Sequence, residues 1–352
     1  MTLRRLRWIF LLIAVVMPFV FLPGCQTLGY YAQAVNGQLA IWNASAPIER
    51  VLEEDDTTPE LRQRLELVSS IRTFASEELA LPDNDSYRNY ADLGRPYVLW
   101  NVFAAPELSL EPETWCFLFA GCVAYRGYFS EDDARQFAAE LRERGLDVYV
   151  GGVPAYSTLG WFDDPVLNTF IGYPDAELAR MIFHELAHQI AYAAGDTVFN
   201  ESFATAVELE GVRRWLESSG QSELFAAFER SRARYRDFLD LVMRTRRDLE
   251  AIYQSEVPDG VKRAQKAQAF ERMLASYGQL KTSWGGYRGF DPWFSESLNN
   301  AKLGSIAAYN ELVPAFQRLL TRHDGNLGDF YETVRELAAL PLEERRGRLA
   351  GA

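Results

Sequence analysis

The sequence predicts an α+β protein that is mostly helical, with a small mixed sheet packed against one helix and a largely helical C-terminal half. Segments rich in aromatic and β-branched residues, typical of strands, are confined to residues 95–162. Apolar residues at helical spacing run through residues 26–90, and almost everything after residue 200 has helical character. The segments expected are a targeting peptide (1–24), an N-terminal helical segment (25–94), a sheet with the helices of a candidate site (95–212) and a helical C-terminal region (213–352), with 25–352 as one compact unit.

The first 24 residues have the features of a lipoprotein signal peptide. Three arginines within the first seven residues precede an apolar run of about fifteen residues, Trp8 to Leu22. That run is short for a membrane span, which needs about twenty residues. Leu22-Pro23-Gly24-Cys25 resembles the box cut by lipoprotein signal peptidase, which leaves Cys25 at the amino end for lipid attachment. An uncleaved anchor and an ordinary secretory signal are the alternatives.

The residue after Cys25 indicates where the protein is located in the cell, and the net charge limits its possible partners. Gln26 rather than Asp follows the cysteine, and in Gram-negative lipoproteins this pattern suggests the outer membrane, here with the domain facing the periplasm. Without its leader the chain has 33 basic and 49 acidic residues, a net charge of −16. Such an acidic surface argues against nucleic acid as a partner and against electrostatic binding to anionic lipid. We therefore expect membrane attachment through lipid on Cys25.

The N-terminal part changes character near residue 95. Before this point a helix is expected, and the break in its pattern falls at Leu81-Pro82-Asp83. Its apolar positions are Leu61, Leu65, Val68, Ile71, Phe74 and Leu79. Strands are then expected at 96–103, 123–129 and 147–150, with a helix from Ser130, its cap, to Gly145.

Cys116 and Cys122 are the two remaining cysteines. In an oxidising compartment they can close a small loop, worth roughly 2 kcal/mol by loop-entropy reasoning. Zinc ligation is the alternative, but no histidine or third cysteine is near them in the sequence. We favour the disulfide.

His184-Glu185-Leu186-Ala187-His188 is the most informative motif of the chain. Two histidines four apart on a helix lie one turn apart on nearly the same face, so both imidazoles can reach one ion. A catalytic zinc site uses three protein groups and a water. Glu201, on a second helix, is the expected third ligand, and Glu185 can take a proton from the water and return it to a leaving amine. The chain has three histidines, so a chance occurrence is improbable.

The flanking sequence places this motif on two neighbouring helices. Asp175 is expected to cap the first helix, and Gly195-Asp196 to end it. A loop of about five residues then leads into a second helix that begins near Asn200. Farther on, long amphipathic helices are expected at 213–250 and 261–277, followed by a Gly- and Trp-rich loop and a final helical region from about Ser295.

The zinc motif together with Asn200-Glu201-Ser202-Phe203-Ala204 resembles the gluzincin peptidases, whose third zinc ligand is a glutamate on a following helix. The chain is similar, over most of its mature length, to a family of Gram-negative bacterial lipoproteins described as zinc aminopeptidases. Besides the zinc motif, the similarity lies in Trp115-Cys116 through Gly121-Cys122, in 125–129, in 152–162, in Asp196-Thr197 and in 199–205. The resemblance implies a gluzincin-like sheet packed on the zinc-binding helix, one Zn²⁺ ion and hydrolysis of peptides or unfolded proteins.

Further site residues are expected from the same resemblance. Related peptidases stabilise the oxyanion with a downstream Tyr or His, for which Tyr309 is the first candidate and Tyr287 the second. They also carry a substrate-binding edge strand just before the zinc helix, which makes Tyr156, Ser157 and Thr158 candidate substrate contacts.

Glu208, seven residues after Glu201, could orient a zinc-bound histidine through its second ring nitrogen; a solvent-facing role is the alternative. The glycine-methionine-glutamate-asparagine motif that holds the substrate amine in known aminopeptidases is absent. An acidic residue such as Asp163 or Asp164 could replace it. His323 is expected in a surface loop.

The leading hypothesis is a lipid-anchored zinc aminopeptidase. A zinc endopeptidase is the first alternative, and a non-catalytic envelope interaction protein on a peptidase scaffold is the second. The intact Glu185 weighs against the second alternative, because a purely structural zinc site has no need of a base there.

Overall fold

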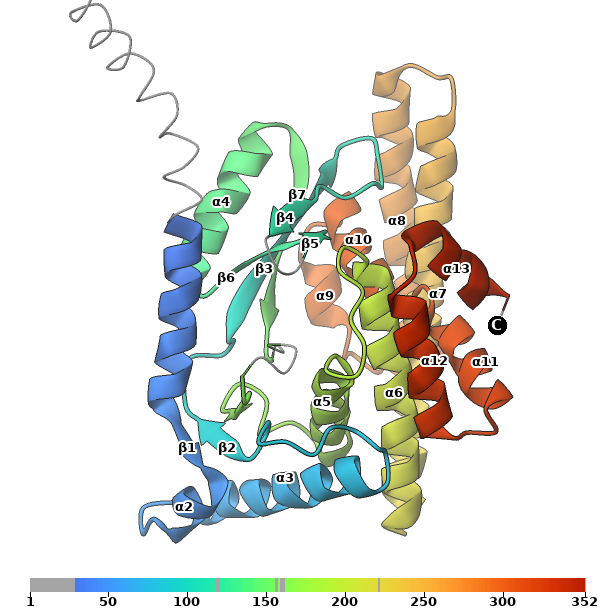
Figure 1. Cartoon of the computed structure of the whole chain (residues 1–352). Helices are drawn as coiled ribbons and strands as arrows, with labels where there is room; N and C mark the ends of the chain where they lie inside the picture. Colours follow the sequence, from blue (N-terminus) through green and yellow to red (C-terminus); the bar gives the residue numbers. More distant parts are fainter. Residues whose placement is uncertain (1–28, 118–120, 156–157, 159–161, 221, 352) are drawn as a thin grey trace, which may run out of the picture.

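The computed structural model describes residues 29–351, apart from 118–120, 156–157, 159–161 and 221, and it leaves the side chains of 222 and 307–309 undescribed. Within these limits the predicted fold class is confirmed, because the protein is α+β, mostly helical, with sheets of two or three strands. Figure 1 shows the strands beside the N-terminal helix, with the long helices on the opposite side of the molecule. The predicted signal peptide and Cys25 lie outside the described residues.

The sheet nearest the candidate site has the strand order β6-β3-β7. Its middle strand, β3 (Leu99–Pro106), pairs antiparallel with both β6 (Arg126–Tyr128) and β7 (Leu146–Val153). Side chains alternate across β3, so Trp100, Val102 and Ala104 pack beneath α4 (Glu131–Glu143) in one core cluster. The functional residues lie on the opposite face of this sheet.

Two smaller sheets complete the β structure. The strands β1 (Ser45–Pro47), β2 (Asn89–Ala91) and β8 (Val166–Leu167) form one sheet, in which β2 and β8 are parallel. The other is the hairpin of β4 (Trp115–Phe117) and β5 (Gly121–Val123), which the predicted disulfide between Cys116 and Cys122 closes.

The strand predictions need three corrections. The single mixed sheet expected from residues 96–150 is instead an antiparallel sheet plus the separate β4–β5 hairpin. The strand expected over 123–129 is interrupted at Ala124 and Tyr125, because β5 pairs with β4 whereas β6 pairs with β3. The expected helical segment 26–90 also contains β1 and β2, and the chain has positive φ at Ala80 and Tyr87, which separates β2 from the preceding helix.

The helices before the candidate site are a helix over residues 29–44, α2 (Ile48–Glu53) and α3 (Pro59–Glu77). The site itself uses α5 (Asp175–Ala187) and α6 (Thr197–Ser218). A glycine lets these two helices come close together: a Cβ at Gly211 of α6 would lie 2.7 Å from the ring of Phe183 on α5. The C-terminal part contains α7 (Ser222–Gln254), α8 (Asp259–Ser283), α9 (Asp291–Ser295), α10 (Asn300–Asn310), α11 (Val313–Arg322), α12 (Leu327–Ala338) and α13 (Leu342–Ala350).

The boundaries of α5 and α6 differ from the prediction. Asp175 is not the cap of α5; it is the first helical residue, and its carboxylate accepts a hydrogen bond from Arg64 at 2.5 Å. Helix α5 ends at Ala187 rather than at Gly195, because the carboxamide of Asn200 holds Ala193 through both its N–H (2.8 Å) and its C=O (3.0 Å). Helix α6 begins at Thr197, and the helix expected at 213–250 is divided near Gly220, which has a φ of 64°.

Asp196 joins the start of α6 to the C-terminal helix. Its side chain is 2% exposed and accepts hydrogen bonds from Phe199 N (3.1 Å), Arg345 Nη1 (2.7 Å) and Arg346 Nη2 (2.5 Å). It therefore caps α6 and also neutralises a guanidinium, that of Arg345, which is itself 7% exposed.

We predict that Asp196→Ala lowers the free energy of unfolding by about 3–5 kcal/mol, because it removes a helix cap and leaves the buried charge of Arg345 without its counter-ion. Urea denaturation followed by circular dichroism measures this. Glu344→Ala, which breaks an exposed ion pair with Arg348 on α13, is the matched control and should change stability by less than about 1 kcal/mol. Equal losses in the two variants would contradict the assignment.

Candidate metal centre

Two histidines and a glutamate converge between α5 and α6. His184 and His188 lie one turn apart at the end of α5, and Glu201 lies in the first turns of α6. The two Nε2 atoms are 3.2 Å apart, and Glu201 Oε2 is 3.3 Å from the first and 3.6 Å from the second. Ligand atoms of a tetrahedral site with bonds of about 2.0–2.2 Å are themselves about 3.3–3.6 Å apart. The three donors therefore have the spacing of ligands to one metal ion.

Glu208 determines which nitrogen of His184 faces this centre. Its Oε2 lies 2.8 Å from His184 Nδ1, and because an ionised carboxylate only accepts hydrogen bonds, Nδ1 is the protonated nitrogen. In the neutral ring, Nε2 then directs a lone pair toward Glu201 Oε2. Two acceptors 3.3 Å apart require a cation between them, which a metal ion or a proton can supply.

The pKa shifts in this cluster also indicate that the site favours additional positive charge. Burial lowers the pKa of His184, but hydrogen bonds with Glu201 and Glu208 outweigh this effect and raise the pKa to about 10. Burial raises the pKa of Glu201, but the charges and hydrogen bonds of the two histidines outweigh it and hold the pKa at about 2. The site thus attracts one added cation.

A second layer of charges holds Glu208. Arg180 Nη1 lies 3.0 Å from both carboxylate oxygens of Glu208, and Arg180 Nε lies 2.7 Å from Glu177 Oε2. Burial raises the pKa of Glu208, but the charge of Arg180 outweighs it and lowers the pKa. His188 differs from His184, because its Nδ1 is buried with no hydrogen-bond partner in the described part of the chain. Among the described residues, the second imidazole thus lacks a partner equivalent to Glu208.

Glu185 lines a cavity of ≈ 340 Å³ together with the three candidate ligands. Its carboxylate is buried, and burial outweighs the nearby histidines to raise the pKa above its ordinary value. A carboxylate with a raised pKa beside a metal site is suited to moving a proton near neutral pH. The cavity is also walled by Tyr30 and Ala34 of the helix over 29–44, so the N-terminal helix closes one side of the site.

Tyr125 and Tyr192 also line this cavity, and neither was among the predicted site residues. Burial is the largest cause of the raised pKa of each, and the negative charge of Glu201 adds to it. Both hydroxyls therefore stay protonated and can donate hydrogen bonds inside the cavity. Tyr125 occupies the break between β5 and β6, which arises from their pairing with different strands, so no local sequence signal points to it.

The predicted oxyanion tyrosines are not brought to the centre by any described contact. Tyr287 is 37% exposed, lies under Arg234 and is absent from the cavity lining, and its role stays a prediction. Tyr309 lies on α10, but its side chain is outside the described residues and its role stays a prediction.

The expected substrate strand over 152–162 ends earlier than predicted. Strand β7 stops at Val153, and Tyr156 and Ser157 lie outside the described residues. Thr158 is not in a strand, and its N–H donates to Asp164 Oδ2 at 2.8 Å. Burial raises the pKa of Asp164 to about 7, and this carboxyl holds Thr158 instead of lining the metal cavity.

The disulfide hairpin packs against the loop that follows α5. A Cβ at Gly121, which has a φ of 73°, would lie 2.8 Å from the backbone nitrogen of Gly195. Phe117 and Val123 of the same hairpin line the metal cavity. The cysteines thus brace the loop between the histidines and Glu201. His323, as expected, is remote from this centre; it follows α11 and contacts Thr333.

We predict that Glu208→Gln weakens metal binding by about 10- to 100-fold, because a neutral side chain no longer orients His184 as strongly or polarises it. Competition with a chromophoric chelator measures the dissociation constant. Glu210→Gln is the matched control, since Glu210 is on the same helix and pairs with Arg213 and Arg214 instead of His184. Unchanged affinity in Glu208→Gln would contradict the orienting role.

Comparison with known proteins agrees with this arrangement. No curated protein and no solved structure matches the chain. A family model with the description "Putative aminopeptidase" matches residues 29–349, which include every element of the centre. The chain belongs to this aminopeptidase family.

Proposed function

We propose that this protein is a zinc-dependent aminopeptidase of the bacterial cell envelope. The observation that carries the proposal is the convergence of His184 Nε2, His188 Nε2 and Glu201 Oε2 within 3.2–3.6 Å, with Glu185 in the same cavity. Membership of the aminopeptidase family supports peptide hydrolysis as the reaction class.

Zinc is the metal we propose because of the donor set. Two imidazoles and one carboxylate are the protein ligands of known catalytic zinc sites, and they leave a fourth position open. When bound, the ion would polarise the scissile carbonyl and lower the pKa of water in the open position. A purely structural zinc site is normally closed by four protein ligands, and the described residues supply three.

The protein's own groups would then move protons and stabilise charge. Glu185 would take a proton from the attacking water and return it to the leaving amine, as its raised pKa favours. The Tyr125 hydroxyl, in a residue that lines the cavity, would be a hydrogen-bond donor to the oxyanion. Tyr309 remains a further candidate for that donor.

A peptide or unfolded protein is the proposed substrate class. The family description favours removal of amino-terminal residues. The acidic candidates for holding the free amine, Asp163 and Asp164, are absent from the cavity lining, and Asp164 accepts a hydrogen bond from Thr158. The exopeptidase assignment therefore depends on the positions of the cuts.

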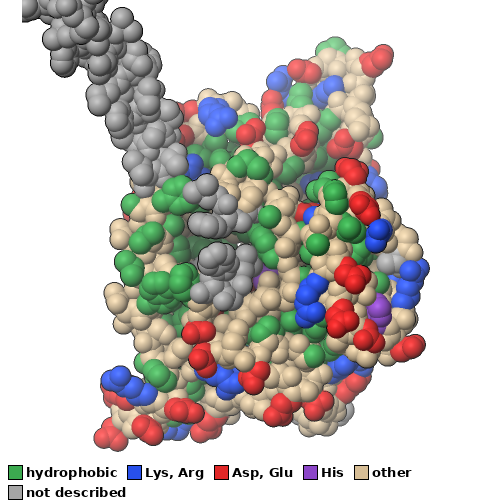
Figure 2. All heavy atoms as spheres, viewed as in Figure 1, with side chains coloured by type: hydrophobic (Ala, Val, Ile, Leu, Met, Phe, Trp, Pro, Cys, Tyr) green, Lys and Arg blue, Asp and Glu red, His purple; other side chains and the backbone are tan. Residues whose placement is uncertain are grey.

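We also propose that lipid on Cys25 holds the protein at the membrane. No helix in the described residues has both the length and the apolarity to cross a membrane. Residues 29–44, which follow Cys25 closely, contain no charged residue, although 24% of the chain is charged. Val35, Leu39 and Trp42, one stripe of that helix, are exposed, and Figure 2 shows hydrophobic side chains gathered there. An uncharged apolar face suits contact with a lipid surface.

We predict that Glu185→Gln retains zinc but lowers kcat by at least about 100-fold, because it removes the proton carrier while leaving all three ligands in place. Hydrolysis of a mixed peptide library by residues 26–352, with mass spectrometry to locate the cuts, gives the rate and the cleavage pattern. Metal analysis gives the zinc content.

Glu217→Gln, an equally conservative change at an exposed ion pair on α6, is the control and should keep the wild-type rate. Stepwise loss of amino-terminal residues supports an aminopeptidase, and internal cuts would make the protein an endopeptidase. Bound zinc with no cleavage of any peptide by the wild-type chain would favour a non-catalytic binding protein.

We predict that Cys25→Ser moves the full-length protein out of the detergent-extractable membrane fraction or leaves it as an unprocessed precursor, because no thiol remains for acylation. Cell fractionation measures the location of the protein, and intact-mass measurement shows its processing and acylation. A variant with wild-type processing and an acylated mass would contradict the assignment.

A further inference from the structure

The face of the β6-β3-β7 sheet opposite α4 carries an unusual row of residues. Directly paired residues of an antiparallel sheet point to the same face, and Asn101 of β3 is paired with Gly127 of β6 and with Gly151 of β7. The row therefore reads Gly, Asn, Gly across all three strands. On either side it is flanked by larger side chains, the pair Phe103 and Tyr149 and the pair Leu99 and Val153.

These two glycines are not required by the backbone. Neither has a positive φ, so an ordinary side chain could adopt the conformation at both positions. The space above them is limited instead: a Cβ at Gly127 would lie 3.1 Å from Asn101 Oδ1, and a Cβ at Gly151 would lie 3.1 Å from the Tyr149 ring. We name this row of small residues between the larger pairs, Gly127, Asn101 and Gly151, the trough.

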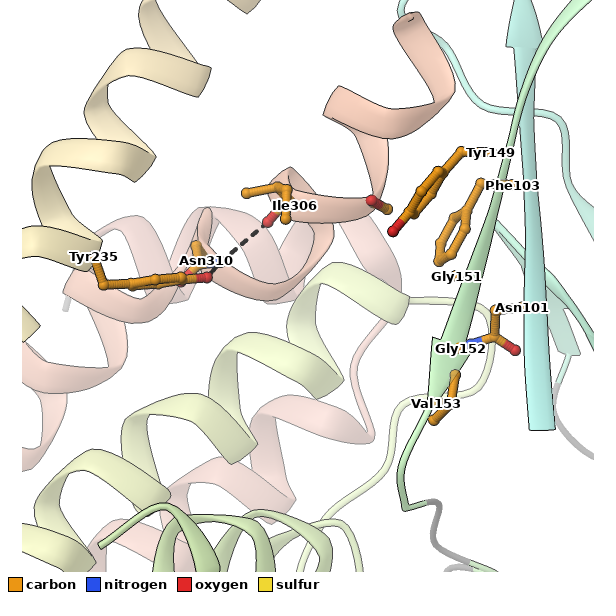
Figure 3. A pocket seen from close by; sticks show the side chains of 10 residues that line it. Asn101, Phe103, Tyr149, Gly151, Gly152, Val153, Tyr235, Ile306 and Asn310 are labelled. Atoms are coloured by element: carbon orange, nitrogen blue, oxygen red, sulfur yellow. Dashed lines mark hydrogen bonds between the residues drawn. The ribbon is translucent and has the colours of Figure 1, made fainter. Parts of the chain in front are cut away.

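The trough lies between two cavities. Gly127 lines the metal cavity, Gly151 lines a second cavity of ≈ 180 Å³ between β7 and the helices α7 and α10, and Asn101 lines both. Figure 3 shows the second cavity with Tyr235, Ile306 and Asn310 on the helical side and the strand residues opposite. Asn101 thus lies between the metal centre and the second cavity.

Asn101 is 5% exposed, and its amide oxygen has no hydrogen-bond partner among the residues that the structure describes. That oxygen lies on the Gly127 side, toward the metal cavity, whereas Figure 3 draws the amide nitrogen on the side of the second cavity. The carboxamide thus offers an acceptor in one direction and a donor in the other. A peptide unit, with one N–H and one C=O, has the complementary pair of groups.

The chemistry of the second cavity indicates what it takes. None of its ten lining residues is charged. The polar groups on its helical wall are already satisfied, since the Asn310 amide donates to Tyr235 Oη (3.0 Å) and to Ile306 O (3.1 Å). Ser305 donates to its own helix at 2.9 Å. Whole ligand sites measure about 300–1,000 Å³, so this volume fits one side chain.

We propose that the Gly127–Asn101–Gly151 row is a substrate channel in which Asn101 binds the peptide backbone and the second cavity receives an apolar or aromatic substrate side chain. The inference rests on the proposed peptidase function and deepens it. Asn101 acts here as a positioning residue, because it would bind the peptide backbone and not the reacting atoms. A dipeptide bound at the metal would lack the residues that occupy the rest of the trough.

The test uses the mature chain and three variants. Asn101→Leu removes the hydrogen-bonding groups at similar size, Gly151→Leu fills the trough from β7, and Ile306→Trp fills the second cavity from α10. Gly278→Leu is the control, because a Cβ at Gly278 meets no atom within 4 Å and the residue lies on α8. Zinc content and circular dichroism show whether each variant is folded and loaded.

We expect Asn101→Leu to raise KM for long peptides up to about tenfold, the loss of one net hydrogen bond, with little change in kcat or in dipeptide turnover. Gly151→Leu and Ile306→Trp should abolish the preference for an aromatic residue at one subsite while still cleaving peptides with glycine there. Folded, zinc-loaded variants with wild-type KM and subsite profiles would overturn the inference and leave the proposed function intact.

A peptide-binding experiment tests this inference independently of the proposed function. If the wild-type chain cleaves nothing, calorimetry still tests the channel. It measures the binding of a phenylalanine-containing peptide to variants that also carry Glu185→Gln. Binding that Gly151→Leu and Asn101→Leu weaken would support the channel although the peptidase proposal had failed. Binding that these changes leave unaltered, or no binding at all, would overturn it.

Discussion

Between α5 and α6 the chain buries the carboxylates of Glu185, Glu201 and Glu208, and Glu208 pairs with the guanidinium of Arg180. With both imidazoles neutral, these four groups leave two negative charges inside the protein, and uncompensated buried charge is strongly unfavourable. A divalent cation between His184, His188 and Glu201 cancels that excess. Without a metal the cluster takes up protons instead, which is why the pKa of His184 is raised. Packing of the two helices and occupancy of the site are therefore coupled.

Helix α6 connects this charged cluster to the rest of the fold. Its residues Glu201 and Glu208, two turns apart, face α5, whereas Phe199 and Phe203 on another side contact Phe316 of α11. Its first turn is held by Asp196 and Asn200, the former bound to α13 and the latter to the loop after α5. Each ligand is thus positioned by a hydrogen bond or core contact that comes from a distant part of the chain.

The residues of the centre could be predicted because their spacing is a property of single helices. The four-residue interval of His184 and His188 and the seven-residue interval of Glu201 and Glu208 place each pair on one helical face, whatever the tertiary structure. The disulfide needed only two cysteines close in sequence. The helix of 29–44, by contrast, was expected, but nothing local shows that it forms a wall of the cavity.

What could not be predicted depends on strand register. Asn101 is an ordinary interior residue of a strand until its partners are known to be Gly127 and Gly151, which are 26 and 50 residues away. Tyr125 enters the cavity because two short strands pair with different neighbours, and apolar alternation shows no such break. Likewise α5 ends early because of a side chain, that of Asn200, from the next helix.

The helix over residues 29–44 has a further consequence for the cell. Three residues separate Cys25 from Gly29, so the start of the helix can lie no more than about 14 Å from Cys25. The inner side of the same helix, through Tyr30 and Ala34, forms a wall of the metal cavity. If Cys25 carries lipid, the cavity is held within a thin layer above the bilayer. The protein would then search a two-dimensional population of peptides, whose effective concentration far exceeds that in the surrounding fluid.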